Sequence, residues 1–250
     1  MKALITGASS GIGRDMARYL SSLGYDIIAV AQRENRLIEL KNELKTNVQV
    51  IPMDLSNKDN CIKLYERVKD QNIDLLVNNA GFGVFGTFAD TDLEKEIKLI
   101  NTNITALHIL TKLFLKDMEE RNSGRILNVS SIASFAPGPL MAAYYSSKAY
   151  VLRLSQAIYK ELKKKKLNVH ISVLCPGPVA TEFNDVAGVH FSQKPLSSEY
   201  VAKYAIDKTI QNKLMIVPGI MNKTVRILSK LAPSKLAMEF VYHNQTKKNN

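Results

Sequence analysis

The stretch Ala3-Leu4-Ile5-Thr6-Gly7-Ala8-Ser9-Ser10-Gly11-Ile12-Gly13 joins a short apolar run to a glycine-rich turn at the start of the chain. The apolar run predicts a buried strand, and a helical pattern begins at Ile12. Such a turn places backbone N–H groups and the positive end of a helix where they can bind a phosphate. A side chain at Gly11 or Gly13 would obstruct that approach. The spacing fits the general dinucleotide fingerprint loosely, so a plain tight turn stays an alternative on these residues alone.

The rest of the chain alternates short apolar runs with longer helical patterns. The expected strands are residues 3–6, 26–31, 48–52, 74–78, 125–130, 169–174 and 214–217. The expected helices are residues 12–23, 34–45, 57–70, 91–121, 143–165 and 198–212. This order predicts right-handed crossovers and a doubly wound, Rossmann-type parallel sheet of seven strands with helices on both faces. We expect residues 1–250 to form a single dinucleotide-binding and catalytic domain, with residues 219–250 as an amphipathic helical extension.

Composition and targeting signals indicate a folded protein of the cytoplasm. Hydrophobic residues make up 46% of the 250 residues and charged residues 23%, which is the ordinary globular balance. The first strand follows Met1 so closely that no signal peptide is expected, and no apolar run reaches the roughly 18 residues that span a bilayer. Cys61 and Cys175 are expected to be buried free thiols. The four histidines have no metal-ligand spacing, so we expect no metal site.

The net charge of +11 raises the question of nucleic-acid binding, with Lys163-Lys164-Lys165-Lys166 as the most basic run. This run closes a predicted helix, where cations complement the negative end of the helix dipole. It has no interleaved aromatic residues for base stacking. A solvated helix end is therefore preferred over an anion-binding surface, and no nucleic-acid partner is expected.

Tyr144 and Lys148 carry the strongest indication of chemistry. Residues four apart on a helix share one face, so the ammonium group can act on the phenol beside it. A free phenol has a pKa of about 10, and a nearby cation lowers it toward the range that is useful for proton transfer. Ser131 lies upstream, where its hydroxyl can donate to a substrate oxygen.

Three ordered motifs together resemble the short-chain dehydrogenase/reductase family, with the resemblance covering roughly residues 2–218. They are Thr6-Gly7-Ala8-Ser9-Ser10-Gly11-Ile12-Gly13, Asn78-Asn79-Ala80-Gly81 and Tyr-x-x-x-Lys at 144–148. The resemblance implies that Tyr144 passes a proton to or from the substrate oxygen while hydride moves to or from the nicotinamide. It further implies that Lys148 binds the nicotinamide ribose, that Ser131 donates to the substrate oxygen, and that Asn103 holds a water linked to the lysine.

Neighbouring residues compete for some of these assignments. Ser130 precedes Ser131, but side chains alternate along a strand end, and the spacing to Tyr144 favours Ser131. Tyr145 has no lysine four residues later and is expected to pack. Asn101 competes with Asn103, where the resemblance alone decides. Cys175 is expected to be a core residue.

The end of the second strand, Val30-Ala31-Gln32-Arg33, decides which dinucleotide binds. A carboxylate there would favour NAD, whereas Arg33 can pair with a 2′-phosphate, with Ser9 or Gln32 as donors. NADP is therefore the expected cofactor, with NAD as the alternative because Glu34 lies nearby and neither Gln32 nor Ser10 is basic. The predicted cofactor-binding residues are Gly7, Ser9, Ser10, Gly11, Ile12, Gly13, Gln32 and Arg33 and, as the resemblance implies, Asp54, Asn78, Ala80, Gly81, Tyr144, Lys148, Pro176, Gly177 and Thr181.

The loops at residues 82–90 and 176–196 leave carboxyl ends of strands, where open α/β sheets bind ligands, and the second is a candidate lid. Apolar residues on such loops predict an apolar or mixed carbonyl or secondary-alcohol substrate, although packing under the loops is an equal alternative. They are Phe82, Phe85, Phe88, Phe135, Leu140 and Phe183. We expect a carbonyl reductase; a dinucleotide sensor or scaffold without turnover is the competing function.

The C-terminal stripe at residues 219–242 alternates apolar positions with Arg226, Lys230 and Lys235. It is expected to pack within the monomer, to cap a dimer partner, or to lie on an anionic membrane surface. The family resemblance also suggests a homodimer or homotetramer built on the helices 91–121 and 143–165.

Overall fold

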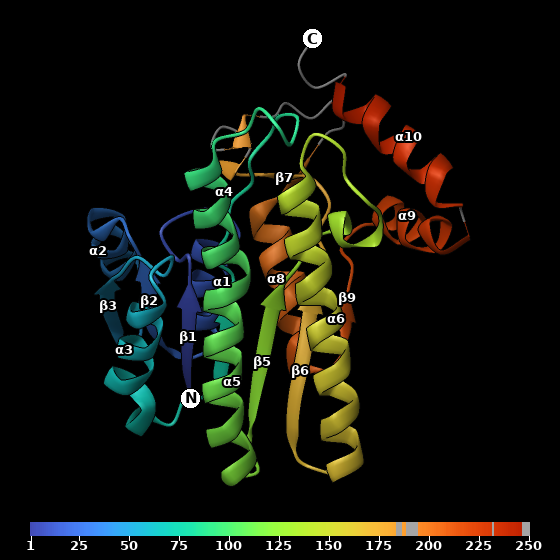
Figure 1. Cartoon of the computed structure of the whole chain (residues 1–250). Helices are drawn as coiled ribbons and strands as arrows, with labels where there is room; N and C mark the ends of the chain where they lie inside the picture. Colours follow the sequence, from blue (N-terminus) through green and yellow to red (C-terminus); the bar gives the residue numbers. More distant parts are fainter. Residues whose placement is uncertain (184–186, 189–194, 232, 247–250) are drawn as a thin grey trace.

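The computed structural model describes residues 1–183, 187–188, 195–231 and 233–246. Within these residues, a seven-stranded parallel sheet runs in the order β3-β2-β1-β4-β5-β6-β9 (Figure 1). Its strands are β1 (Lys2–Thr6), β2 (Asp26–Ala31), β3 (Val48–Pro52), β4 (Leu75–Asn78), β5 (Gly124–Val129), β6 (Val169–Leu174) and β9 (Met215–Ile216). The predicted doubly wound Rossmann-type fold is confirmed, with strand ends shifted by a residue or two.

Helices cover both faces of the sheet, because alternate residues of each buried strand point to opposite sides. On one face lie α1 (Gly11–Ser22), α2 (Glu34–Glu43) and α8 (Ser198–Ile210), packed on Ala3 and Ile5 of β1. On the other lie α3 (Lys58–Val68), α5 (Leu107–Glu120) and α6 (Ala142–Lys165), packed on Leu4 of the same strand. In Figure 1, α5 and α6 stand in front of the sheet, with α1 and α8 behind it.

The predicted helix 91–121 contains a change of helical type. It consists of α4 (Leu93–Ile100), a π-helical segment η2 (Asn101–Ala106) and α5. Short π segments insert an extra residue into a turn and are frequent at functional sites. The site residue Asn103 lies in this segment. Short 3₁₀ helices η1 (Lys69–Gln71) and η3 (Ile132–Phe135) complete this half of the fold.

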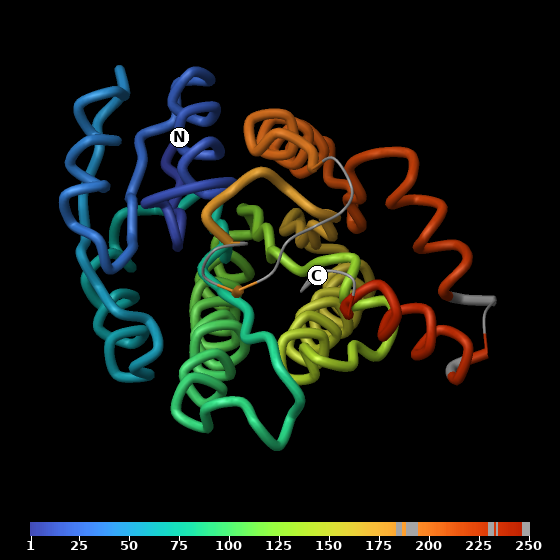
Figure 2. The backbone as a smooth tube through the Cα atoms, turned by 90° about the horizontal axis from the view of Figure 1, so that it is seen from above, coloured from blue at the N-terminus to red at the C-terminus, as the bar shows by residue number. Residues whose placement is uncertain are grey.

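The predicted loop 176–196 contains two short strands, β7 (Val179–Ala180) and β8 (Leu196–Ser197), which pair in parallel. Residues 184–186 and 189–194 of the candidate lid lie outside the described residues. The C-terminal extension, predicted to be helical, forms two helices, α9 (Ile220–Leu231) and α10 (Ser234–Thr246). Both lie beside the main body, and α10 runs back toward the carboxyl ends of the strands (Figures 1 and 2).

The four consecutive lysines lie at the C-terminal end of α6. The lysine run ends α6, and Lys166 takes a left-handed conformation with φ 56° that stops the helix. No helix of the described part of the chain is long and apolar enough to cross a bilayer.

Candidate functional site

A cavity of about 1350 Å³ opens at the carboxyl ends of the strands. Its wall brings together the glycine turn, the end of β2, the segment after β4, the N-terminal part of α6 and the segment after β6. Of the predicted site residues, the following line it: Gly7, Ser9, Ser10, Gly11, Ile12, Gln32, Arg33, Ala80, Gly81, Ser131, Tyr144, Lys148, Pro176, Gly177 and Thr181. Segments far apart in sequence therefore meet at one edge of the sheet, as expected for parallel strands.

The glycine turn is shaped to accept a phosphate group. Gly7 and Gly11 have φ of 67° and 53°, in the left-handed region that favours glycine. A Cβ at Gly13 would collide with the carbonyl of Gly7 and the side chain of Asn79. α1 begins at Gly11 with no acidic residue in its first turn, so its N–H groups and positive end are available to an anion.

Asn79 fixes the turn from the neighbouring strand. Its Nδ2 donates to the carbonyl oxygens of Thr6 at 3.0 Å and Gly7 at 3.2 Å. The Thr6 hydroxyl in turn accepts from the backbone N–H of Ala80 at 3.0 Å. These bonds tie the end of β1 to the end of β4, so the turn and the Asn-Asn-Ala-Gly motif form one rigid unit.

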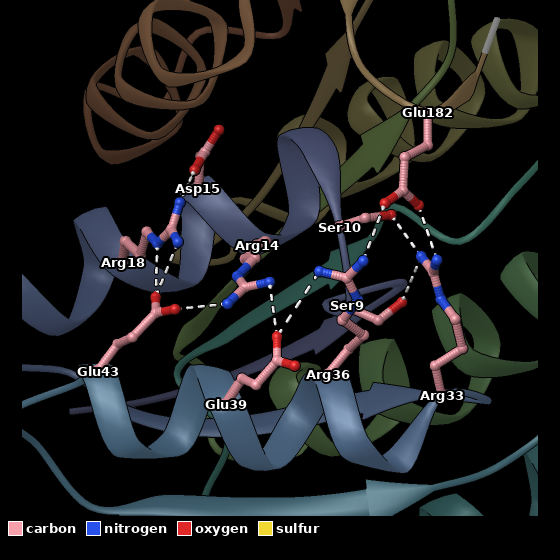
Figure 3. A network of polar contacts seen from close by, with 10 residues as sticks. All are labelled: Ser9, Ser10, Arg14, Asp15, Arg18, Arg33, Arg36, Glu39, Glu43 and Glu182. Atoms are coloured by element: carbon pink, nitrogen blue, oxygen red, sulfur yellow. Dashed lines mark hydrogen bonds and ion pairs between the residues drawn. The ribbon is translucent and has the colours of Figure 1, made fainter. Parts of the chain in front are cut away.

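Arg33 lies at the mouth of the cavity and donates to three side-chain oxygens (Figure 3). Its Nη1 donates to Glu182 at 2.7 Å, and its Nη2 donates to Ser10 at 2.8 Å and Ser9 at 3.2 Å. Arg36 lies 3.9 Å from the second oxygen of Glu182. The hydrogen bond from Arg33 lowers the pKa of the Glu182 carboxyl, which therefore stays ionised at neutral pH. A cationic group with two hydroxyls beside it suits a phosphate monoester.

Tyr144 and Lys148 occupy one face of α6, as their spacing predicted, and both are buried. The Lys148 ammonium lies 5.7 Å from the centre of the Tyr144 ring and donates to the carbonyl of Val129 at 3.0 Å. The Ser131 hydroxyl lies beside Tyr144, donates to the carbonyl of Pro176 at 3.4 Å and accepts from the backbone N–H of Ala133 at 3.1 Å. A phenol, a hydroxyl and an amine thus converge on the cavity.

The protonation of the pair differs from the prediction that Lys148 lowers the pKa of Tyr144. Burial raises the pKa of Tyr144 well above its ordinary value, while the hydrogen bond from Ser131 lowers it in part. Burial also lowers the pKa of Lys148 to about 8. Desolvation disfavours the charged form of each group, so it raises the pKa of the phenol and lowers that of the amine. The phenol is therefore protonated at neutral pH in this state of the protein.

Asn103 is buried behind this group. Its Oδ1 accepts from the backbone N–H of Phe82 at 3.1 Å, and its Nδ2 donates to the carbonyl of Phe82 at 3.0 Å and to Ser147 at 3.1 Å. A Cβ at Gly81 would approach both Asn103 Oδ1, at 2.8 Å, and Lys148 Nζ, at 3.4 Å. Asn103 therefore connects the loop after β4 to the α6 helix, whereas Asn101 is partly exposed.

Some predicted cofactor contacts do not line the cavity. Gly13 and Asp54 are among them, the latter accepting from Gln32 Nε2 at 2.8 Å. Asn78 points into the interior, donating to Thr111 at 3.0 Å and Asn128 at 2.9 Å. Within the described residues, these three and Asn103 are not part of the cavity surface. Asn78 alternates away from the crevice because it is still a residue of β4.

The competing assignments are separated by hydrogen bonding. The Ser130 hydroxyl donates to the carbonyl of Lys148 at 2.7 Å, so it points away from Ser131 as the strand alternation predicted. Tyr145 accepts from Gln245 Nε2 at 2.9 Å, which anchors α10 beside the site. Cys175 is a buried free thiol whose pKa burial raises to about 11, as a core residue requires.

Apolar residues form the inner wall where a substrate would lie. Phe82, Phe85, Phe135 and Phe183 line the cavity as expected. Phe88 and Leu140 do not belong to its described surface, and Phe88 is 70% exposed. Among the described residues there is no group of three acidic, histidine or cysteine side chains that could hold a metal ion.

Glu182 and the two C-terminal helices contribute to the site although they were not predicted to, and Asn79 was predicted only as part of its motif. Asn79 carried a signal, because it adjoins Asn78 in the same motif. Glu182 had none in sequence, since it lies 149 residues from Arg33. The residues that α9 and α10 contribute to the wall include Met221, Leu228, Leu236 and Phe240.

Comparison with known proteins agrees with this geometry. The family model of short chain dehydrogenases matches residues 1–188. Ketoacyl reductase HetN of Nostoc is 32% identical over 235 residues, covering 92% of this chain and 78% of HetN. A short-chain dehydrogenase from Sphingobium yanoikuyae, solved with NADPH, superposes with a TM-score of 0.81 at 27% identity, covering 93% and 96% of the two chains. A bulky-bulky ketone specific alcohol dehydrogenase from Comamonas testosteroni gives 0.79 at 27% identity, covering 92% and 91%.

Proposed function

Because this chain belongs to the short-chain dehydrogenase/reductase family, and is thus an NAD(P)-dependent oxidoreductase of alcohols and carbonyl compounds, we propose that it is an NADP(H)-dependent carbonyl reductase. The observation that carries the proposal is the convergence of Ser131, Tyr144 and Lys148 with the glycine turn on one cavity. A sensor without turnover would have no use for a buried phenol with an amine and a serine hydroxyl beside it.

The residues of the crevice fit a dinucleotide. The N-terminus of α1 would hold the pyrophosphate, with Gly11 and Gly13 leaving space for it. Ala80, Gly81, Pro176, Gly177 and Thr181 would enclose the nicotinamide, and Gly7 and Ile12 would support the turn. Asp54 and Asn78 act without lining the cavity, the first by orienting Gln32 and the second by fixing the end of β4. When bound, the reduced dinucleotide supplies a hydride.

The choice of NADP rests on Arg33. Its guanidinium, together with the hydroxyls of Ser9 and Ser10, forms a cationic donor set at the mouth of the cavity. A 2′-phosphate would bind there by charge-assisted hydrogen bonds, with Gln32 beside it. No carboxylate stands at positions 31 and 32 to accept from a free ribose hydroxyl. The ion pair with Glu182 is the interaction that the phosphate has to replace.

Tyr144 is the proposed proton donor to the carbonyl oxygen. Its raised pKa keeps the phenol protonated at neutral pH, which is the form that reduction requires. Ser131 would donate to the same oxygen as negative charge develops on it. Lys148 would bind the nicotinamide ribose and stabilise the phenolate after proton transfer. Asn103 would hold the loop after β4 against α6 and position a water between Lys148 and solvent.

The substrate is proposed to be an apolar or mixed carbonyl compound, because phenylalanines dominate the inner wall. HetN is described as a ketoacyl reductase and the Comamonas enzyme as specific for bulky ketones, and both descriptions fit such a wall.

We further propose that residues 1–250 act as one unit in the cytoplasm, where the buried free thiols Cys61 and Cys175 would stay reduced. Oligomers are common in this family, and a homodimer or homotetramer through α5 and α6 is our expectation. The hydrogen bond from Gln245 to Tyr145 supports packing of the C-terminal extension within the monomer over contact with a membrane surface.

The proposal is tested by titrating the protein with NADPH and NADH and following NADPH oxidation with a panel of ketones. We expect turnover with NADPH, and Arg33→Ala should weaken NADPH binding by about ten- to hundredfold while changing NADH binding little. Tight NADPH binding without turnover on any ketone would favour the sensor. Equal affinity for the two dinucleotides would contradict the role of Arg33.

A further inference from the structure

Four exposed apolar side chains of the C-terminal helices face the same cavity as Tyr144. Met221 and Leu228 of α9 are 66% and 58% exposed, and Leu236 and Phe240 of α10 are 65% and 70% exposed. All four belong to the cavity wall that also contains Ser131 and Tyr144. Exposed apolar groups that gather on a concave surface next to a reaction site mark a ligand-binding face.

Polar contacts near the start of α9 and near the end of α10 hold the two helices beside the cavity. The buried side chain of Asn222 starts α9: its Nδ2 donates to the carbonyl of Pro218 at 2.7 Å, and its amide carbon lies 2.7 Å from where a Cβ at Gly177 would be. Gln245 near the end of α10 donates to Tyr145, the neighbour of Tyr144. Both helices are therefore anchored to segments of the candidate site.

The apolar residues of α10 form a continuous track from this anchor. Leu236, Phe240 and Asn244 repeat every four residues, and Ala237, Val241 and Gln245 run beside them, so both rows lie on one side of the helix. From Gln245 back to Leu236 the track is about 14 Å long at the rise of an α-helix. It leads from the hydrogen bond at Tyr145 to the outer part of the wall.

We propose that α9 and α10 form a binding site for the hydrocarbon chain of a long-chain carbonyl substrate, with the carbonyl at Tyr144 and the chain along Leu228, Leu236 and Phe240. The inference rests on the proposed function for the reaction at the carbonyl. The occupant is a chain of the substrate, because the apolar face of α9 and α10 is concave and continuous with Ser131 and Tyr144. A second copy of the protein or a membrane would have to cover an outward surface instead.

The helices also provide matched controls. Ile227 adjoins Leu228 and is 61% exposed, and Tyr242 is 47% exposed two residues after Phe240, yet neither belongs to the described cavity wall. Replacing any of these four by serine removes an exposed apolar side chain, so folding should be preserved. The pairs differ in one respect, whether the side chain faces the cavity.

The experiment measures kcat/KM with NADPH for straight-chain methyl ketones from butanone to dodecan-2-one. In the unmodified protein each added methylene should raise kcat/KM about fourfold while the chain is being buried. Leu228→Ser and Phe240→Ser should flatten this gain through KM. Ile227→Ser and Tyr242→Ser, which lie outside the described cavity wall, should keep the gain and leave kcat for butanone unchanged.

A binding measurement separates this inference from the reaction. Dansylaminoundecanoic acid should become fluorescent on binding the unmodified protein and the two control variants, and much less so on binding Leu228→Ser or Phe240→Ser. Probe binding with that pattern but no ketone reduction would overturn the proposed function and leave the chain site standing.

Reduction of short ketones with no gain along the series, or an equal gain in all four variants, would overturn the chain site and leave the reductase standing. An unchanged gain combined with loss of a dimer, or of binding to phosphatidylglycerol vesicles, would reassign the face to a second copy or to a membrane.

Discussion

Arg33 and Glu182 join the two sides of the cavity mouth: Arg33 Nη1 donates to the Glu182 carboxylate at 2.7 Å, although 149 residues separate them in sequence. Arg33 follows β2, and Glu182 follows the Thr181 that we assign to the nicotinamide side. The arginine proposed to select the cofactor is therefore already paired with a carboxylate of the protein (Figure 3).

This pairing predicts that Glu182→Gln tightens the binding of NADPH. The carboxylate and a 2′-phosphate compete for the same guanidinium, and a pair that is nearly half exposed on both sides is worth about 0–1 kcal/mol. The dissociation constant for NADPH should thus fall by up to about fivefold, with that for NADH unchanged, as measured by calorimetric titration. Glu39→Gln is the control, because Glu39 contacts Arg14 and Arg36. An equal change for NADH would show that Glu182 acts by holding its loop instead.

Tyr144→Phe should lower kcat for ketone reduction by about a hundredfold to ten-thousandfold, since it removes the proposed proton donor. NADPH binding should change little. Tyr145→Phe is the matched control: its hydroxyl accepts from Gln245, so its loss should loosen α10 and leave most of the turnover with butanone. Steady-state kinetics of both variants decides between them. A Tyr144→Phe variant as fast as the unmodified protein would refute the mechanism.

The lowered pKa of Lys148 predicts a specific dependence of stability on pH. Below about pH 8 the lysine is protonated in both folded and unfolded protein, and its buried charge costs stability. Between about 8 and the ordinary value of 10.5, the unfolded chain binds more protons than the folded one, so stability rises with pH. The difference in unfolding free energy between the unmodified protein and Lys148→Met should therefore shift in favour of the unmodified protein between pH 7 and 9.5, by roughly 3 kcal/mol at most.

Urea unfolding of both proteins at several pH values measures this difference. The highest pH of this series, 9.5, stays below the range in which Tyr144 affects stability. Because the pKa of Tyr144 is raised in the folded protein, stability falls only when tyrosines of the unfolded chain ionise, near pH 10. A constant difference across the window would mean that Lys148 is not desolvated.

Gly13→Ala should destabilise the protein by about 1–3 kcal/mol and weaken NADPH binding, because its methyl group would collide with the carbonyl of Gly7 and displace the phosphate turn. Gly24→Ala is the comparison: Gly24 has φ 85° but open space around the position of a Cβ. This second change should lower thermal stability through backbone strain and leave the dinucleotide titration as it was. Equal loss of binding in both would indicate a global effect.

The sequence predicted the elements of the fold with few errors. Apolar runs such as Asp26–Ala31 and Val169–Leu174 are strands of six residues buried between two helical layers, and their hydrophobicity follows directly from that position. The π-helical segment around Asn103 was not predictable, because its residue types are also compatible with an α-helix. The sequence predicted correctly that Tyr144 and Lys148 share one face of α6. The predicted lowering of the Tyr144 pKa differs from the structure, because burial by residues distant in sequence raises it and lowers the pKa of Lys148.

By itself, the sequence determined the parallel sheet, the glycine turn and the relation of Tyr144 to Lys148, because strand, turn and helix patterns act over a few residues. The pairing of Arg33 with Glu182, the inward direction of Asn78 and the apolar wall from α9 and α10 were decided by the tertiary structure. These contacts join segments separated by tens to hundreds of residues, and the packing of the sheet with its two helical layers sets their distance and their exclusion of water.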